Sequence, residues 1–253
     1  MKEFKDKKYF FEVLENRKKA LGKAVLNKGI INENDDEKTQ LKQLSKNKLV
    51  LTNLNYDILH VMYSCGFTKE ELKQQFNITL DSFIANWDKK IVKIHTGRNQ
   101  VETDHYYIEY YIRLRWMFSF AILLNIDDEA IMTLIEIVKN DNVKDAFFDF
   151  VIASKIDNWD VSDNLSLKKP KNRIVEIIYE TDTKKCESLI TSYLKKDWHK
   201  TYKNYSQYNS HLKADENFYF KGHWAFEVAA LVKIKTLDDS TFRDNKYYPD
   251  RLI

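Results

Sequence analysis

The scarcity of glycine and proline constrains the fold of this chain more than any other feature of its sequence. Five glycines and two prolines occur among 253 residues. A β-rich fold of this length needs many tight turns, and tight turns rely on these two residues. The shortage therefore favours long helices joined by few connections.

Apolar side chains recur at helical spacing along most of the chain. Phe10, Leu14 and Leu21 share one face of a helix expected over 3–27. The stretch 106–124 is apolar or aromatic around most of its circumference, which predicts a buried central helix. Other helices are expected over 37–64, 80–95, 129–138, 142–154 and 222–236. The sequence thus predicts an all-α, bundle-like globular protein with a central buried helix and no sheet beyond a short hairpin.

The chain can be divided into an N-terminal helical region, 1–100, and a C-terminal helical region, 101–253. No internal repeat, low-complexity tract or flexible linker forces this division. One continuous domain is therefore also compatible with the sequence.

Motifs of several common protein classes do not occur in the sequence. Neither GxGxxG nor the P-loop string is present, which argues against a Rossmann or P-loop fold. Cys65 and Cys186 form no CxxC motif and no disulfide framework. The first 26 residues are charged throughout, and the apolar run 116–124 is too short to span a bilayer. We therefore expect a reduced, cytoplasmic protein without a membrane segment.

Charged residues are unevenly distributed along the chain. The net charge is +3 overall, but residues 101–167 have five basic and thirteen acidic side chains, a net charge of −8. The flanking segments 1–50 and 168–213 have net charges of +5 and +6. Such a pattern is typical of solvated helix faces, or of a surface that receives a basic partner. The acids expected on the outer faces of two successive helices are Asp127, Asp128, Glu129, Glu136, Asp141, Asp145 and Asp149.

The pair His223 and Glu227 has the spacing of two metal ligands on one helix face. No third ligand stands at a metal-type spacing, and no HExxH motif is present. Apolar residues flank Glu227, so we expect a buried carboxylate that a backbone or tyrosine donor satisfies. The pair therefore does not predict a metal site.

Two other pairs could suggest catalysis. Asp238 and Asp239 follow the last expected helix, where capping and a turn explain them better than acid–base chemistry. Cys186 and His199 belong to no thiol-dyad motif, and a buried helix cysteine is the simpler interpretation. We therefore expect no enzyme, no metal and no cofactor.

The last 32 residues carry the most specific pattern of the sequence. Its members are Gly222, Trp224, Glu227, Asp238, Asp239, Ser240, Tyr247, Tyr248 and Pro249. This tail resembles the C-terminal signature of the PoNi-like immunity proteins of bacterial polymorphic toxin systems. His223 departs from the aromatic residue that the family has after the glycine.

The resemblance extends along most of the chain. The segment "YSCG", Tyr63–Gly66, is similar to a motif in the N-terminal part of the family, and 111–127 and 145–153 resemble two of its helices. The resemblance implies an all-helical cytoplasmic protein that binds and neutralises a cognate toxin. In this family the toxin is often a DNase that a secretion system delivers in competition between bacteria. The motif residues are expected to be structural.

These observations leave competing hypotheses about function. The first is an immunity protein whose acidic residues contact the basic groove of a nuclease. Such a protein would not bind nucleic acid directly, and it could be a homodimer. The alternative is a helical nucleic-acid-binding protein, with Trp198, Tyr202, Tyr205 and Tyr208 among the lysines of 168–213 as its footprint. A third, a hydrolase, rests only on the Asp238/Asp239 and His223/Glu227 pairs.

Overall fold

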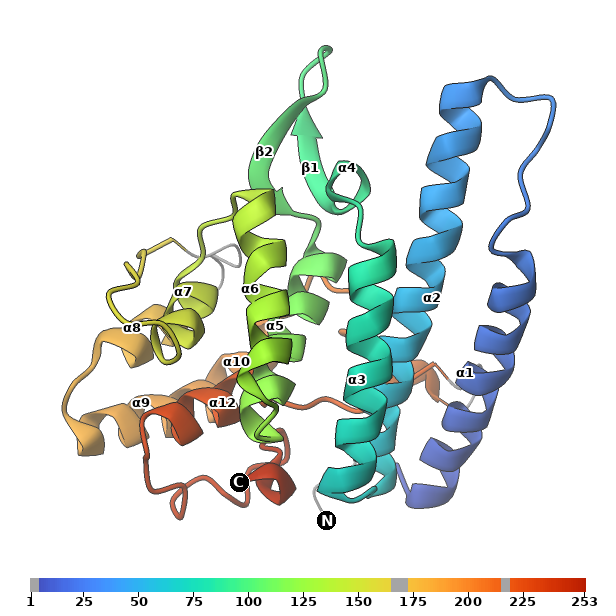
Figure 1. Cartoon of the computed structure of the whole chain (residues 1–253). Coiled ribbons are helices and arrows are strands. Elements are labelled where there is room, and N and C mark those ends of the chain that lie inside the picture. Colours follow the sequence, from blue (N-terminus) through green and yellow to red (C-terminus); the bar gives the residue numbers. More distant parts are fainter. Residues whose placement is uncertain (1–4, 165–172, 215–218) are drawn as a thin grey trace. The chain divides into compact units, whose positions relative to one another are not determined.

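The chain is mainly helical in the computed structural model, which describes residues 5–164, 173–214 and 219–253 (Figure 1). The α-helices are α1 (Lys7–Asn27), α2 (Glu37–Cys65), α3 (Lys69–Asn86), α4 (Lys89–Val92), α5 (Ile108–Leu123), α6 (Asp128–Asp141), α7 (Ala146–Ala153), α8 (Arg173–Tyr179), α9 (Thr183–Lys196), α10 (Trp198–Thr201) and α12 (Phe226–Ile234). Two 3-10 helices are η1 (Ser210–Lys213) and η2 (Asp250–Leu252). Strands β1 (Lys93–Thr96) and β2 (Val101–Tyr106) form a hairpin, the one sheet in the described part of the chain. The predicted all-α fold is confirmed.

The chain divides into two compact units. The N-terminal unit contains Lys5–Thr103 and Lys213–Gly222, and the C-terminal unit contains Asp104–Leu212 and His223–Ile253. A short segment from late in the sequence therefore belongs to the first unit, which the sequence did not predict.

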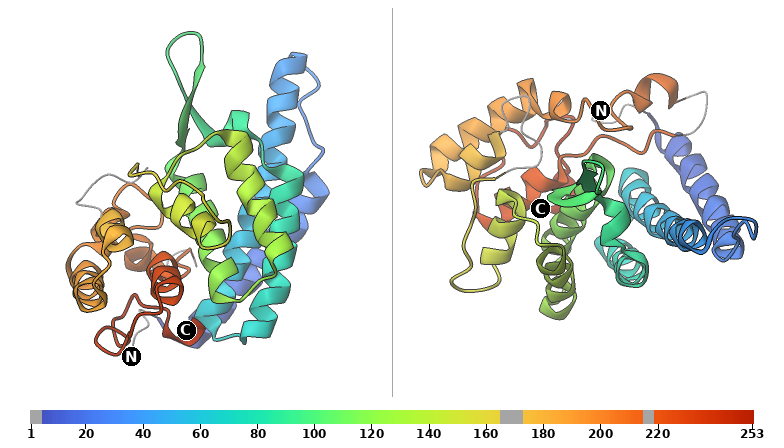
Figure 2. Two further views of the ribbon diagram at one scale, coloured as in Figure 1. Left: turned by 60° about the vertical axis from the view of Figure 1, so that its left-hand side comes forward. Right: turned by 90° about the horizontal axis from the view of Figure 1, so that it is seen from above.

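Helices α1, α2 and α3 make up most of the N-terminal unit, and α2 packs against both of the others. Figure 2 shows them side by side from two further directions. Local signals set their ends: Thr68 and Glu71 form a capping box at the start of α3, and Gly66 ends α2 with a φ of 88°. Asp36 caps α2 by accepting from the backbone N–H of Thr39 at 3.1 Å.

The late segment is held in the N-terminal unit by specific polar contacts. The N–H of Phe220 donates to the Tyr9 hydroxyl at 3.1 Å, and the Ser64 hydroxyl donates to the Lys221 carbonyl at 2.6 Å. The buried Lys221 ammonium forms an ion pair with Asp57 on α2. The ion pair matters because the charge of Lys221 would be costly to bury without a partner.

The helix expected over 80–95 is wrong in its extent. Helix α3 ends at Asn86, and Trp87 is extended with φ −70° and ψ 120°. Asp88 then caps the short α4 by accepting from the N–H of Lys90 at 2.9 Å. The chain continues into β1, where the Ile94 carbonyl accepts from the Thr103 hydroxyl of the partner strand at 2.8 Å.

Helix α5 is the core of the C-terminal unit, as predicted for the central helix. Every residue from Tyr111 to Leu123 is buried except Arg113, which is half-buried. Helices α12 and α7 both pack against α5. The helix begins at Ile108 because Tyr106 still belongs to β2, where its hydroxyl donates to Asp141 at 2.7 Å.

No helix in the described ranges combines the length and apolar character needed to cross a membrane.

Candidate functional site

The seven acids predicted on an outer surface separate into two groups. Asp127, Asp128, Glu129 and Glu136 are exposed on α6 or at its start. Asp141, Asp145 and Asp149 are buried, with exposed fractions of 3%, 0% and 5%. The expectation that all seven face outward is therefore wrong for the last three.

Each of the three buried carboxylates has a structural partner. Asp141 accepts from the Tyr106 hydroxyl, and burial beside this carboxylate raises the pKa of Tyr106 well above its ordinary value. Asp145 caps α7 by accepting from the backbone N–H of Phe147 at 3.0 Å. Asp149 accepts from Trp159 Nε1 at 3.1 Å and from the Ser162 hydroxyl at 2.6 Å; these three acids therefore hold the fold together.

The exposed acids form a stripe along one face of α6. Asp128, Met132 and Glu136 are spaced by four residues, and Glu129 lies beside them at the i, i+3, i+7 spacing. We call these four residues the α6 stripe. Met132 is 39% exposed and is the apolar member of the stripe. Lys155 pairs with Asp128 at 3.0 Å and Lys139 pairs with Glu136 at 2.7 Å, so part of the negative charge is compensated.

The aromatic residues of the alternative nucleic-acid hypothesis are mostly inaccessible. Trp198, Tyr202 and Tyr205 are buried, with exposed fractions of 2%, 3% and 5%. Stacking on bases requires an open ring face. This arrangement counts against 168–213 as a footprint for nucleic acid.

The buried Trp198 and Tyr202 instead surround the signature residue Glu227. Trp116 Nε1 donates to Glu227 Oε2 at 2.8 Å, and Trp198 Nε1 donates to Glu227 Oε1 at 2.7 Å. The Tyr202 hydroxyl also donates to Oε1, at 2.7 Å. The prediction of a buried carboxylate with a tyrosine donor is confirmed, and two indoles add to it.

A buried guanidinium completes this network. Arg115 on α5 lies 3.6 Å from Glu227 Oε1, and neither side chain has any exposure. Its Nη2 also donates to the Tyr202 hydroxyl. The rings of Tyr111 and Phe147 lie 5.2 and 5.9 Å from the guanidinium carbon, within cation–π range. The network fixes α5, α10 and α12 together.

Other signature residues of the tail are also packed. Trp224 is 4% exposed and Tyr248 is fully buried. The Tyr247 carbonyl accepts from the N–H of Ala225 at 2.8 Å. The end of the chain therefore folds back onto the start of α12. In the N-terminal unit, Tyr63 is buried near the end of α2.

The acidic pair after α12 forms a turn, as predicted. Asp238 accepts from the N–H and hydroxyl of Ser240 at 3.0 and 2.9 Å. Asp239 accepts from Arg243 Nε at 2.9 Å and is 7% exposed. The two carboxylates serve the turn rather than converge on a common point.

Three histidines that the sequence did not connect meet in the C-terminal unit. His199 lies on α10, His211 on η1, and His223 follows Gly222, whose φ of 104° only glycine adopts readily. One ring nitrogen of each lies within 4.8 Å of the other two. Their spacing of twelve residues belongs to no short metal motif, so sequence reasoning had no local signal for this cluster.

The cluster joins neither His223 to Glu227 nor His199 to Cys186, the two pairs considered from the sequence. Glu227 binds the two indoles and Tyr202, whereas His223 Nε2 lies 3.0 Å from His211 Nδ1. Cys186 is buried, with its sulfur 3.6 Å from the Ile177 carbonyl oxygen, and burial raises the pKa of its thiol.

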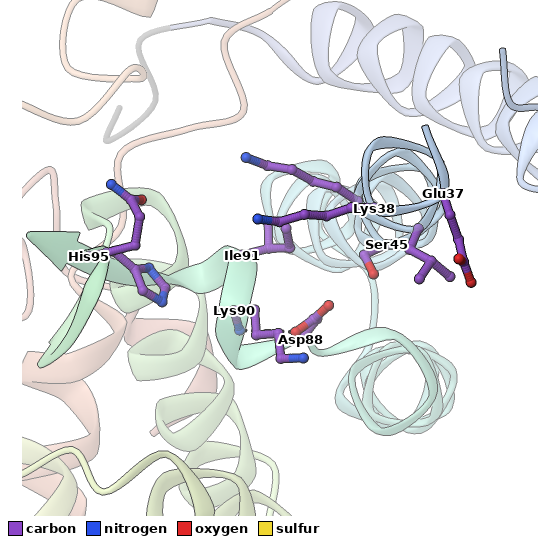
Figure 3. A pocket seen from close by; sticks show the side chains of 10 residues that line it. Glu37, Lys38, Ser45, Asp88, Lys90, Ile91 and His95 are labelled. Atoms are coloured by element: carbon purple, nitrogen blue, oxygen red, sulfur yellow. Dashed lines mark hydrogen bonds between the residues drawn. The ribbon is translucent and has the colours of Figure 1, made fainter. Parts of the chain in front are cut away.

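The N-terminal unit contains a pocket of about 690 Å³ between α2, α4 and the hairpin. Figure 3 shows that Lys38 and Ser45 reach it from α2, and Asp88 and Lys90 from the α4 side. Acidic and basic side chains both line it, so it favours no single class of charged ligand.

Two family models match this chain over almost its whole length. The model of the N-terminal part of PoNe immunity proteins (PoNi) matches residues 2–136, and the model of their C-terminal part matches residues 143–252. No curated protein and no solved structure gives a match. The C-terminal match contains Trp198, Tyr202, Glu227 and the packed tail. The N-terminal match contains Arg115 and Trp116 of the same network, as well as Tyr63 and Gly66. The chain therefore belongs to the family of PoNe immunity proteins.

Proposed function

We propose that this chain protects the cell that makes it by binding a PoNe toxin and blocking a DNase activity of that toxin. Membership of the immunity family supports a toxin as the partner. A DNase binds a polyanion, so its substrate groove is expected to be basic. A protein that covers such a groove is expected to offer acidic side chains, because complementary charge speeds association and selects the partner.

The α6 stripe is the observation that carries this proposal. Asp128, Glu129 and Glu136 are exposed around Met132, and Asp127 adds a further acid at the start of the helix. An apolar side chain surrounded by charged ones is the usual composition of an interface core and its rim. The stripe lies on one regular helix of 14 residues, so its side chains are held at fixed spacing.

Charge reversal of the stripe tests the proposal. The variant Asp128→Lys/Glu129→Lys/Glu136→Lys should associate with the toxin at least about tenfold more slowly at low ionic strength. The difference should shrink as salt is added, because exposed charges are screened beyond about 10 Å at 0.1 M. Association rates from stopped-flow fluorescence or surface plasmon resonance would measure this, and survival of toxin-expressing cells would report protection.

A matched control keeps the same change in net charge at other positions. Asp157, Glu176 and Asp244 are exposed acids of the same unit outside α6. The variant Asp157→Lys/Glu176→Lys/Asp244→Lys should associate at nearly the rate of the unmodified chain. Equal slowing in the two variants would assign the effect to overall charge, and no slowing in either would remove the α6 stripe from the interface.

A further inference from the structure

We propose that His199, His211 and His223 bind one Zn²⁺ ion. Imidazole nitrogens are preferred zinc ligands, and three protein ligands with a fourth position for water form a complete coordination shell. No motif in the sequence predicts this site, and it is separate from the α6 stripe.

The distances within the cluster suit a small metal ion. With Zn–N bonds of about 2.0–2.1 Å, two ligand nitrogens of a tetrahedral ion lie roughly 3.4 Å apart. His211 Nδ1 and His223 Nε2 are 3.0 Å apart, and one ring nitrogen of each of the three histidines lies within 4.8 Å of the other two. Small side-chain adjustments would therefore bring the three nitrogens to bonding distance of one ion.

The surroundings of His199 orient its ring as those of metal ligands commonly do. Its Nε2 lies 3.1 Å from the Tyr208 carbonyl oxygen, which can only accept, so Nε2 carries the proton and Nδ1 carries the lone pair. Histidine ligands usually donate their second N–H to a carbonyl or carboxylate in this way. The Tyr208 and Tyr247 rings stack on the imidazole with centroids 4.4 and 5.6 Å away.

Burial also favours the neutral form of two of the three imidazoles. Burial lowers the pKa of His199 and of His211 below the ordinary histidine value. A neutral imidazole is the form that binds metal. His223 is 8% exposed and the other two are half-buried, so an ion could enter from solvent.

One nearby charge opposes a cation. The exposed Lys246 contributes to the lowered pKa of both His199 and His211, and its ammonium lies 4.9 Å from the centre of the Tyr247 ring. Its long side chain can move toward solvent. Removal of this charge should therefore strengthen zinc binding.

Zinc titration of the metal-free chain without a polyhistidine tag tests the proposal. With a chromophoric chelator as competitor, the chain should bind one equivalent of Zn²⁺, and its melting temperature should rise. Groups that only orient a ligand contribute about 10- to 100-fold to affinity, so loss of a ligand in His211→Ala should weaken binding by roughly 100-fold or more. Lys246→Met should bind more tightly than the unmodified chain.

His105→Ala provides the control, because His105 is a half-buried histidine outside the cluster. It should bind zinc like the unmodified chain. Circular dichroism should show that His211→Ala is folded, and His199→Gln is the second variant if it is not. The proposal is overturned if the unmodified chain shows no saturable binding, or if folded cluster variants bind zinc as tightly as His105→Ala.

Discussion

At the scale of single residues, Glu227 is a fully buried carboxylate with several polar partners. Its carboxylate accepts from Trp116, Trp198 and Tyr202, and it balances the charge of the fully buried Arg115. Loss of one member of a buried ion pair leaves the other charge without compensation, which is more costly than the pair is stabilising.

Glu227→Gln should therefore lower the free energy of unfolding by about 3–5 kcal/mol. The amide is nearly the same size as the carboxylate, so the change removes charge and one acceptor without leaving a cavity. Urea unfolding followed by tryptophan fluorescence would measure it. Glu176→Gln on an exposed face should change stability by less than about 0.5 kcal/mol, and an equally small effect for Glu227→Gln would contradict the role of the network.

Trp224 should contribute to stability through the volume that its buried side chain fills. The side chain is 4% exposed, so Trp224→Ala should destabilise the chain by about 3–5 kcal/mol through lost burial and a remaining cavity. Tyr107→Ala, at a side chain that is 47% exposed, is the comparison and should have a much smaller effect. If thermal unfolding gives the same melting temperature for the two variants, Trp224 does not belong to the core.

At the scale of elements, the sequence predicted best what neighbouring residues decide. Asp36, Thr68 and Asp127 each cap a helix by accepting from the backbone N–H three residues later, a spacing that is visible in the sequence. The buried face of α5 was recognised from its apolar circumference. Each of these features depends on spacing along the chain alone.

Other features depend on residues that are remote in sequence. Asp141 and Asp149 look like outer acids in the sequence, and they are buried because Tyr106 and Trp159 supply donors. The histidine cluster likewise requires a backbone path that no local pattern encodes. The expected helix over 80–95 ended early because β1 pairs with β2 instead of continuing the helix. Because Asp141, Asp145 and Asp149 are buried, the charge count over 101–167 overstates the negative charge at the surface.

Asp127 allows the contributions of capping and of negative charge at the start of α6 to be separated. Its carboxylate accepts from the N–H of Ala130 at 2.9 Å, so Asp127→Ala should cost about 1 kcal/mol of stability. Asparagine caps about as well as aspartate, so Asp127→Asn should retain stability while removing one negative charge. Chemical denaturation of both variants would check this. A loss in Asp127→Asn as large as that in Asp127→Ala would mean that charge, rather than capping, stabilises the start of α6.

At the scale of the whole molecule, both parts of the PoNe immunity family are represented in one chain. The matches to residues 2–136 and 143–252 follow one another in order. The N-terminal unit nevertheless includes Lys213–Gly222, so its fold requires chain from within the C-terminal match. A truncated chain that ends near residue 136 should therefore lack the contacts of Phe220 and Lys221 with α1 and α2.

The most direct test of the proposed function is a titration of toxin nuclease activity with this chain. Purified PoNe toxin would be mixed with rising amounts of the chain, and cleavage of plasmid DNA would be measured after each addition. A protein that blocks the toxin by tight binding should abolish cleavage at a roughly equimolar ratio, and it should leave an unrelated nuclease fully active. Persistent cleavage at a large molar excess of folded chain would contradict the proposal.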